Sequence, residues 1–375
     1  MEKPEDYFYM TSYMNVEKFY VEGVSISVLG ILGIIGNMLA LKVFSRPSLR
    51  DVFHQLLFAV ASFDLVYIII GGVNYTFKAL HANLDVYVYL FPHVIYPFTH
   101  IAATGVIFMA VAITIERHLV LCHPLLRHTS RKAWHYVVPV IILSIIVNAP
   151  KFFEVEHRWI NLIDQDTNKT INVIYNSGTE LRFQENHIIG YRMWARLICD
   201  CFMPVLILLY LNIRIILALI SSTRDQQANS RRRLRTEINL TLVLLCIVFI
   251  FFLCHAPLMI LDVYEALMVE NVIGCQRLQK CTKKGLIWLP KNGFFYFLPK
   301  VSHLMQILNS SINFIVYCLV GHDFRRELCQ TFGITKHSLT DQSLNGPGSD
   351  DKGGQLEQFP IQGMKANTTA EKSPQ

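Results

Sequence analysis

The chain has 375 residues, of which 52% are hydrophobic and 17% are charged, and its formal net charge is +6. This length would allow two or three soluble domains, but soluble domains carry about 25% charged residues. Because these averages do not decide the class of protein, the distribution of the charges along the chain has to decide it.

Seven stretches that are long enough to cross a bilayer are nearly free of charged residues. Five contain no Asp, Glu, Lys or Arg, one contains only Asp64, and one contains Arg196 and Asp200. A membrane helix needs about 20 mostly apolar residues, a length that apolar runs in soluble helices rarely reach. In chain order the stretches are 24–41, 52–77, 86–115, 133–150, 193–213, 238–261 and 301–322. The sequence therefore predicts an all-α membrane protein with a seven-transmembrane helix bundle and excludes a soluble enzyme.

Lys and Arg residues are unevenly shared between the two alternating sets of connections. Residues 42–51, 117–132 and 221–237 make up the first set, and residues 1–22, 78–86, 151–190 and 265–300 make up the second. The first set carries a net charge of +9 and the second −1. Since short cytoplasmic loops are rich in Lys and Arg, we expect the first set and the C-terminus inside and the N-terminus outside. Segment 265–300 carries +4 and is the exception to this rule.

Most cysteines lie in or beside the predicted spans or on the cytoplasmic side, and only Cys275 and Cys281 lie clearly outside. Disulfides form in the oxidising extracellular compartment, so we expect this pair to form a small loop disulfide rather than two free thiols. The pair does not suit zinc, because no second pair of ligands accompanies it.

Several polar side chains interrupt the first, second and seventh spans. Amide and carboxylate groups are costly in hydrocarbon, so each needs a partner or a function. They are Asn37, Asp64, Asn309, Ser310 and Asn313. We expect them to form one buried polar cluster that joins the three helices. A purely structural role is the alternative, and we favour it for Asn37.

Two prolines, Pro204 and Pro257, lie in the middle of predicted spans. A proline frees a backbone carbonyl inside a helix and causes a kink. Both are therefore candidate hinges, and in the sixth span Phe251 and His255 come just before Pro257.

Short motifs resemble those of the rhodopsin-like (class A) family of G-protein-coupled receptors over residues 20–332. Each motif is weak alone, but their order and spacing across seven spans are specific. They are Gly36-Asn37, Ser62-Phe63-Asp64, Glu116-Arg117-His118, Cys254-His255-Ala256-Pro257 and Asn313-Phe314-Ile315-Val316-Tyr317. Residues 324–329 look like the family's short amphipathic eighth helix, in which Cys329 resembles a palmitoylation site.

This resemblance divides the chain into four expected parts. They are an extracellular segment, 1–22, a seven-transmembrane bundle, 23–320, a membrane-parallel helix, 321–335, and a cytoplasmic tail, 336–375. The tail is rich in Ser, Gly, Gln, Asn, Asp and Pro, a composition typical of disorder. Its Ser and Thr residues are candidate sites for receptor kinases and hence for arrestin.

Some positions depart from the family pattern. Pro92 occupies the usual third-helix cysteine position and segment 151–190 has no cysteine, so we do not expect the family's extracellular disulfide. Val106 stands where a serine commonly completes a sodium site around Asp64. The resemblance therefore does not support sodium binding, and no cofactor is expected.

Other departures narrow the resemblance to invertebrate FMRFamide-type neuropeptide receptors. His255 replaces a tryptophan of the family, Phe314 replaces a proline, and Ala149-Pro150-Lys151-Phe152-Phe153-Glu154 is similar to this group. The resemblance implies a plasma-membrane receptor without enzymatic activity. Such a receptor binds an extracellular neuropeptide, here of the RFamide type, and activates a heterotrimeric G protein inside; no nucleic acid is expected as a partner.

The resemblance also implies roles for residues near the cytoplasmic side. Arg117 pairs with Glu116 in the resting state and turns toward the G protein on activation, next to His118. Asn313 and Tyr317 continue the polar relay from Asp64. Three further basic residues are Arg231, Arg232 and Arg233. They face acidic membrane lipids and the G protein, or they only reflect the charge rule for inner loops, and the two interpretations are equally favoured.

The outer halves of the spans offer candidates for binding the cationic or amidated end of a peptide, which needs a carboxylate and hydrogen-bond partners. Asp262, five residues after Pro257, is the first choice for the cation. Asp200 is second, because Arg196 lies four residues earlier on the same helix face, and we slightly favour mutual neutralisation of that pair. The remaining candidates are Tyr96, Thr99, His100, His303 and Gln306.

Two outer segments, 151–190 and 265–300, are much longer than ordinary connections of about 4–6 residues, which favours a peptide ligand. Segment 265–300 either rests on the outer leaflet or covers the pocket. Asn168 begins a glycosylation sequon in the first of these segments. The alternatives are a receptor for a non-peptide small molecule and a transporter, although a transporter predicts inverted repeats that the sequence does not show.

Overall fold

Apolar stretches fold as helices in a membrane because their backbone groups must be satisfied within the segment itself. The computed structural model describes residues 19–79, 85–123, 132–163, 170–224, 231–267 and 294–332. Seven of its helices are long and apolar enough to cross a membrane. They are Phe19–Phe44, Val52–Phe77, Val86–Cys122, Trp134–Phe153, His187–Ser221, Glu237–Tyr264 and Leu298–Val320. The predicted helix bundle is confirmed.

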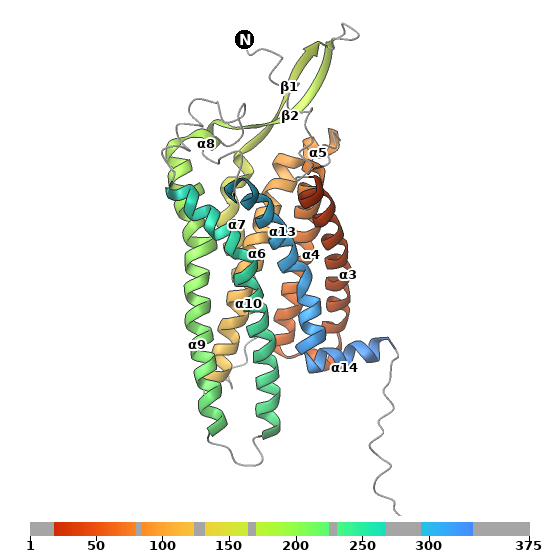
Figure 1. Ribbon diagram of the computed structural model, residues 1–375, viewed down its shortest axis with the longest axis vertical. Helices are drawn as coiled ribbons and strands as arrows, with labels where there is room; N and C mark the ends of the chain where they lie inside the picture. Colours follow the sequence, from red (N-terminus) through yellow and green to blue (C-terminus); the bar gives the residue numbers. More distant parts are fainter. Residues whose placement is uncertain are drawn as a thin grey trace, which may run out of the picture. The chain divides into compact units, whose positions relative to one another are not determined.

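The main helices pack into a closed bundle (Figure 1). They are α3 (Ile26–Phe44), α4 (Val52–Ala79), α6 (Tyr96–Cys122), α7 (Trp134–Asn148), α9 (Met203–Arg224), α10 (Arg231–Leu267) and α13 (Phe294–Val320). Helix α3 packs against α4 and α13, α4 against α6, α6 against α7 and α9, and α10 against α13. Helix α6 lies at the centre of the bundle. In the span that contains α6, 61% of the most apolar stretch is buried, whereas in the span that contains α7 this share is 22%.

Several spans contain π-helical segments in their N-terminal halves. These are η1 (Phe19–Ser25) before α3, η3 (Phe91–Ile95) before α6, and η6 (His187–Ala195) and η7 (Leu197–Phe202) before α9. A short helix, α5 (Asp85–Leu90), precedes η3. Because π-helical turns rotate the side chains that follow them and are frequent at functional sites, they change which residues face the interior.

The segment between the fourth and fifth spans contains a β hairpin. Strands β1 (Val155–Ile163) and β2 (Thr170–Gly178) are antiparallel, with Val155 opposite Gly178 and Ile163 opposite Thr170. The hairpin follows a 3-10 turn, η5 (Ala149–Phe153), and leads into α8 (Glu180–Phe183). Figure 1 shows it extending beyond the ends of the helices. The sequence predicted only a long connection here, and not its strands.

The expected eighth helix is present as α14 (His322–Thr331), which runs crosswise to the bundle in Figure 1. Phe324 anchors it: its side chain is 2% exposed, and its ring lies 5.1 Å from that of Phe44 and 5.5 Å from that of Tyr317.

Three helix boundaries differ clearly from the sequence-based limits. The first span begins at Phe19 rather than at residue 23, and α9 and α10 extend to Arg224 and from Arg231 into the expected connection 221–237. An apolar run ends at the first charged residue, whereas Arg, Lys and Glu are good helix formers. The helices therefore extend beyond the apolar stretches from which they were predicted.

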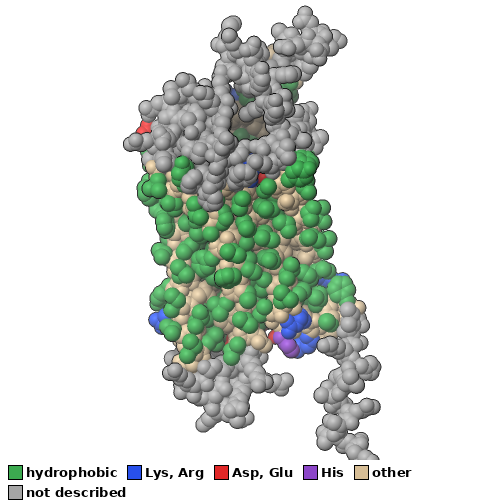
Figure 2. Space-filling view, viewed as in Figure 1, with side chains coloured by type: hydrophobic (Ala, Val, Ile, Leu, Met, Phe, Trp, Pro, Cys, Tyr) green, Lys and Arg blue, Asp and Glu red, His purple; other side chains and the backbone are tan. Residues whose placement is uncertain are grey.

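The outward faces of the helices are apolar. Figure 2 shows hydrophobic side chains over the middle of the visible face and charged side chains near its two ends. On α7, for example, Ile142 is 52% and Ile146 is 62% exposed. Continuous apolar surface of this kind is unfavourable in water, so these faces are suited to contact lipid.

Gly33 allows α3 and α13 to approach closely. A Cβ atom at this position would lie 2.8 Å from Ile68 on α4 and nearer still to Ser311 on α13. Small residues are enriched where membrane helices pack, because they let backbones come together. The contact also brings the backbone of α13 next to Asn37.

Replacing Gly33 by valine should destabilise the bundle. The added side chain would overlap Ser311 and Ile68, and overpacking of this kind costs about 1–3 kcal/mol. We expect a lower melting temperature of the detergent-solubilised protein. Gly72→Val is the matched control, because nothing lies within 4 Å of a Cβ atom at Gly72; equal losses in both variants would contradict the steric explanation.

Candidate functional site

Arg117 lies near the C-terminal end of α6 in a buried group of charges. Its Nε atom is 2.6 Å from Glu116 Oε2 and its Nη2 atom is 2.8 Å from Glu116 Oε1. Its Nη1 atom is 3.3 Å from Oε2 of Glu237, which belongs to α10. The guanidinium also lies 4.4 Å from the ring centroid of Phe53 on α4. Arg117 therefore connects three helices.

The two carboxylate contacts of Arg117 depend on different parts of the structure. Burying a charged side chain is costly unless it is paired, and Arg117 and Glu116 are each only 5% exposed. The Glu116 contact lies within α6, so it survives a movement of whole helices. The Glu237 contact requires α6 and α10 to stay close, and an outward movement of α10 would break it. The predicted contact between Glu116 and Arg117 is confirmed.

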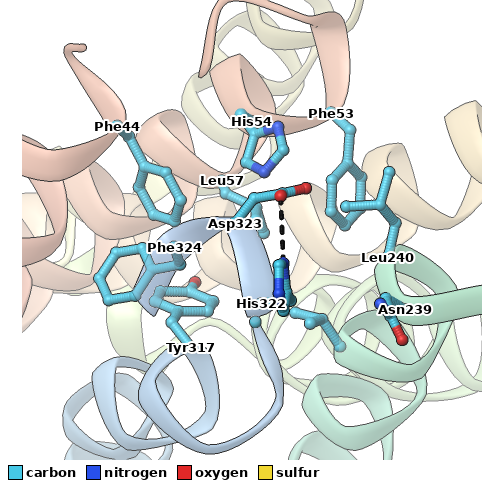
Figure 3. Close-up of a pocket in the computed structure, with 12 residues that line it drawn as sticks. Phe44, Phe53, His54, Leu57, Asn239, Leu240, Tyr317, His322, Asp323 and Phe324 are labelled. Atoms are coloured by element: carbon cyan, nitrogen blue, oxygen red, sulfur yellow. Dashed lines mark hydrogen bonds and ion pairs between the residues drawn. The ribbon is translucent and has the colours of Figure 1, made fainter. Parts of the chain in front are cut away.

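A small hollow lies beside this group, between α3, α4, α10 and the junction of α13 with α14. In Figure 3, the rings of Phe44, Phe324 and Tyr317 gather on one side, with Phe53 and Leu240 on the other. Its lining residues are Phe44, Phe53, His54, Leu57, Asn239, Leu240, Val243, Tyr317, Gly321, His322, Asp323 and Phe324. Because α10 forms one wall, a movement of α10 would change the shape of the hollow.

The predicted polar cluster joins α3, α4 and α13. Asn313 Nδ2 donates to Asp64 Oδ2 at 2.8 Å, and Asn37 Nδ2 donates to the backbone carbonyl of Ser310 at 2.9 Å. Asn309 is also buried, at 5% exposure. These contacts confirm that the polar residues of the three helices come together.

The cluster is only partly satisfied within the described part of the chain. Asn37 Oδ1, Asp64 Oδ1, Asn313 Oδ1 and the Tyr317 hydroxyl are buried without a hydrogen-bond partner among the described residues. An unsatisfied buried polar atom costs about 1–3 kcal/mol.

The two candidate hinge prolines lie in different settings. Pro257 lies inside α10, six residues after Phe251 and two residues after His255. The ring of His255 stacks on that of Phe251 at 4.1 Å, and its Nδ1 atom is 3.0 Å from the Phe251 carbonyl oxygen. Pro204 follows directly on the π-helical segment η7 at the beginning of α9. Both positions remain candidate hinges.

At the other end of the bundle, Asp200 contacts Arg196 in its own span and Thr104 on α6. Its Oδ2 atom is 3.6 Å from Arg196 Nε, which confirms the pairing predicted from their four-residue spacing. Thr104 Oγ1 donates to Asp200 Oδ1 at 3.1 Å, and Asn148 Nδ2 donates to Thr104 Oγ1 at 2.9 Å. The carboxylate of Asp200 is therefore largely occupied by residues of the protein itself.

The candidates on α6 lie near this group but differ in their partners. The rings of Tyr96 and His100 meet edge to face at 4.9 Å, and the Tyr96 hydroxyl donates to Glu154 Oε2 at 2.5 Å. Thr99 is buried and donates to the carbonyl of Ile95 in the preceding turn. Tyr96 and His100 are thus better placed than Thr99 to contact a ligand.

His303 and Gln306 belong to a separate cluster between α13, α4 and η1. His303 Nδ1 is 2.8 Å from Glu22 Oε1, and its ring stacks on that of Tyr75 at 4.2 Å. The Tyr67 hydroxyl donates to Gln306 Oε1 at 2.7 Å. The structure therefore divides the predicted ligand-binding residues into two groups.

Four charged residues of these clusters were missed by the sequence analysis: Glu22, Lys151 and Glu154, which are buried, and Glu237, which is partly buried. All four lie at or beyond the edges of the apolar stretches, where charged side chains are expected to be solvated. The three-residue spacing of Lys151 and Glu154 was an available signal for a pair in one helical turn. Glu22 and Glu237 have partners far away in the sequence, and no local pattern indicated them.

Some predicted sites cannot be located. Cys275, Cys281 and Asn168 lie outside the described residues, as do residues 1–18 and the tail. The residues Arg231, Arg232 and Arg233 begin α10, but their side chains lie outside the described set. Asp262 is partly buried near the end of α10, a helix that contacts η6 and η7. Cys329 is exposed on α14.

Comparison with known proteins places most of the chain in one family. The sequence model described as "7 transmembrane receptor (rhodopsin family)" matches residues 36–317. These limits include the first-span asparagine Asn37 and the seventh-span tyrosine Tyr317, and hence every span with its motifs.

The similar proteins of known function are receptors. The chain is 28% identical to the FMRFamide receptor of Drosophila melanogaster, over 82% of the chain and 53% of that receptor. It is 25% identical to the FMRFamide peptide receptor frpr-18 of Caenorhabditis elegans, over 93% and 79%. It is 23% identical to the human melatonin receptor type 1B, over 90% and 85%. The chain thus spans about half the length of the Drosophila protein.

Proposed function

The chain belongs to the rhodopsin family of seven-transmembrane receptors, and we propose that it is a plasma-membrane receptor that binds an extracellular neuropeptide and activates heterotrimeric G proteins. Because the members of this family are receptors, the expectation that the chain is not an enzyme is confirmed. The observation that carries the proposal is Arg117, which is held by Glu116 within its own helix and by Glu237 across the bundle.

In this mechanism, ligand binding shifts the population between two packings of the helices. In the resting packing, Glu237 holds α10 against Arg117. When α10 moves outward, Arg117 loses this partner and becomes available to the G protein, while Glu116 limits the cost of its exposure. The cluster of Asp64 and Asn313 lies between the two ends of the bundle and relays the change to Tyr317.

The orientation in the membrane follows from the charges. The connections beside Arg117 are the basic ones, so we propose that they are cytoplasmic, with the N-terminus outside. Helix α14 would lie along the inner membrane surface, where the exposed Cys329 could carry a lipid. Residues 336–375 would form a cytoplasmic tail for receptor kinases and arrestin, and Asn168 would be glycosylated outside.

A neuropeptide of the RFamide type is the ligand class best supported. Two of the similar receptors are FMRFamide receptors, and such peptides carry a cationic arginine next to an amidated end. Asp200 is paired with Arg196, and Asp262, five residues after Pro257 on α10, is our choice for the peptide cation. Tyr96 and His100 would contact its aromatic or amide groups.

A panel of amidated peptides, tested for nucleotide exchange on a G protein in membranes containing the expressed chain, is the direct test. Each active peptide is compared with its free-acid counterpart, and the Arg117→Ala variant shows whether the response depends on the receptor. Melatonin is included because of the similarity to melatonin receptors. A response to melatonin and to no peptide would favour a receptor for a small molecule and contradict the peptide assignment.

Replacing Asp262 by asparagine should raise the half-maximal concentration of an active peptide at least about tenfold, which corresponds to about 1.4 kcal/mol. The substitution keeps the size of the side chain but removes the charge that would pair with the peptide cation. Glu156→Gln, which neutralises an exposed carboxylate on the hairpin, is the matched control. A change much smaller than tenfold at Asp262 would count against its assignment.

A further inference from the structure

Lys151 and Glu154 form an almost fully buried ion pair at the end of the fourth span. The Lys151 Nζ atom is 2.9 Å from Glu154 Oε1 and 3.1 Å from Oε2, and the two side chains are 1% and 0% exposed. Lys151 lies in η5, and Glu154 ends it. The pair thus lies where the chain leaves α7 and enters the β hairpin.

Two other elements contribute hydrogen bonds to the same carboxylate. The Tyr96 hydroxyl on α6 donates to Glu154 Oε2 at 2.5 Å, and His187 Nε2 on η6 is 3.1 Å from Oε1. Lys151 Nζ also lies 5.1 Å from the ring centroid of Tyr191 on η6. Glu154 therefore connects the fourth span to the third and to the fifth.

The backbone at Glu154 also holds the foot of the hairpin. The Thr179 amide donates to the Glu154 carbonyl at 3.0 Å, and Thr179 Oγ1 donates to the Phe153 carbonyl at 2.6 Å. Thr179 is the residue that follows β2. Both ends of the hairpin are thus fixed at the position where the buried ion pair is anchored.

The partners of Glu154 keep it ionised. Burial alone would raise the pKa of the Glu154 carboxyl, but the charge on Lys151 and the hydrogen bonds from Tyr96, Lys151 and His187 outweigh burial and lower this pKa to about 2. Segment 151–190 contains no cysteine, so a disulfide cannot take over this function within the hairpin.

We propose that Lys151 and Glu154 act as positioning residues for the ligand site, holding the hairpin and η6 at a fixed place against α6. Through Tyr96 and through the η6 segment that precedes Arg196 and Asp200, the pair sets the spacing of the groups that face the ligand. It takes the place of a covalent cross-link on this side of the bundle. The effect on peptide binding rests on the proposed function, but the effect on the hairpin does not.

Hydrogen–deuterium exchange of the full-length protein in lipid nanodiscs, without ligand, tests the positioning directly. In Glu154→Gln, which keeps the shape of the side chain but removes its charge, amides of residues 155–163, 170–178 and 187–195 should exchange at least about tenfold faster, because hydrogen bonds to a charged group are lost. Amides of α13 should be unchanged. Glu156→Gln, two residues further on and exposed, should have no effect on any of these segments.

Tyr96→Phe provides a milder variant if Glu154→Gln does not fold, because it removes a single hydroxyl. It should accelerate exchange in the same segments by a smaller factor, and Glu154→Asp should restore part of the protection in comparison with Glu154→Gln. In cells, Glu154→Gln should raise the half-maximal peptide concentration about tenfold or more while leaving the maximal response per surface receptor unchanged.

Unchanged exchange in the hairpin and η6 would overturn the proposal, and so would equal acceleration in every helix, which indicates general destabilisation. If the exchange result is as expected but the peptide response is unaltered, the pair holds the hairpin without positioning the ligand site, and that part of the proposal is wrong. If no peptide activates the unaltered chain, the proposed ligand class fails, while the exchange experiment still decides whether the pair positions the hairpin.

Discussion

Replacing Arg117 by alanine should abolish ligand-stimulated nucleotide exchange while leaving ligand binding within about threefold of its original affinity, or roughly 0.7 kcal/mol. Arg117 lies near the end of α6 opposite Tyr96 and Thr99, far along the helix from the proposed ligand site. Its loss removes the only group in this buried set that can carry a positive charge to the G protein. The measurements are radioligand or fluorescent-peptide binding and nucleotide exchange on the same membranes.

The Arg117→Ala variant leaves the carboxylates of Glu116 and Glu237 without their cation, so it can lose activity through misfolding as well as through loss of the charge. Expression at the cell surface must therefore be compared, and Arg214→Ala, which removes an exposed arginine of α9, serves as the control. Exchange that persists at the level of the Arg214→Ala variant would refute the role assigned to Arg117. Loss of both binding and exchange would point to misfolding. The Arg117→Gln variant, which removes the charge but keeps a polar side chain, would then show the effect of losing the charge alone.

Replacing Glu237 by glutamine should have the opposite effect and raise nucleotide exchange in the absence of ligand. The substitution weakens the contact between Arg117 Nη1 and Glu237 Oε2, at 3.3 Å, without altering the Glu116 pair. If the interhelical contact stabilises the resting packing by about 1 kcal/mol, its loss shifts the equilibrium about fivefold toward the active packing.

The conservative variant Glu237→Asp retains the charge on a shorter side chain and should give an intermediate level. Basal exchange is measured per surface receptor, and increased peptide affinity should accompany the increase, because a ligand that favours the active packing binds better when that packing is populated. Basal exchange that does not rise above that of the unaltered chain would show that Glu237 does not stabilise the resting packing.

The two variants together test the direction of the mechanism. Arg117 is needed for the active state and Glu237 for the resting state, so the double variant should be inactive like Arg117→Ala. An active double variant would mean that the two residues act independently of each other.

The sequence allowed the seven spans to be predicted because hydrophobicity is a local property, visible in about 20 consecutive residues. Pairs within one helix were also accessible: Arg196 and Asp200 are four residues apart, and Glu116 precedes Arg117. The meeting of Asp64 and Asn313 could be expected because polar residues buried in a membrane seek one another. In each of these cases the signal is either local or follows from the cost of an isolated polar group.

Contacts such as Arg117 with Glu237 and Glu22 with His303 could not be predicted. They depend on how far each helix extends past its apolar stretch and on its rotation about its own axis. Helix α10 begins before its apolar run, which places Glu237 in the bundle, and the π-helical segments η1, η6 and η7 alter the rotation of the residues that follow. The hairpin was missed because its strands lie between helices in a segment recognised only by its length.

The β hairpin has a practical consequence for studying this receptor. It is a folded surface that extends beyond the helix ends, with Trp159 62% exposed on β1. In the proposed orientation, a conformation-specific antibody raised against β1 and β2 would bind intact cells without detergent extraction. Because the backbone of Glu154 is hydrogen-bonded to Thr179 at the foot of the hairpin, binding of such an antibody would report on the folding of this end of the bundle.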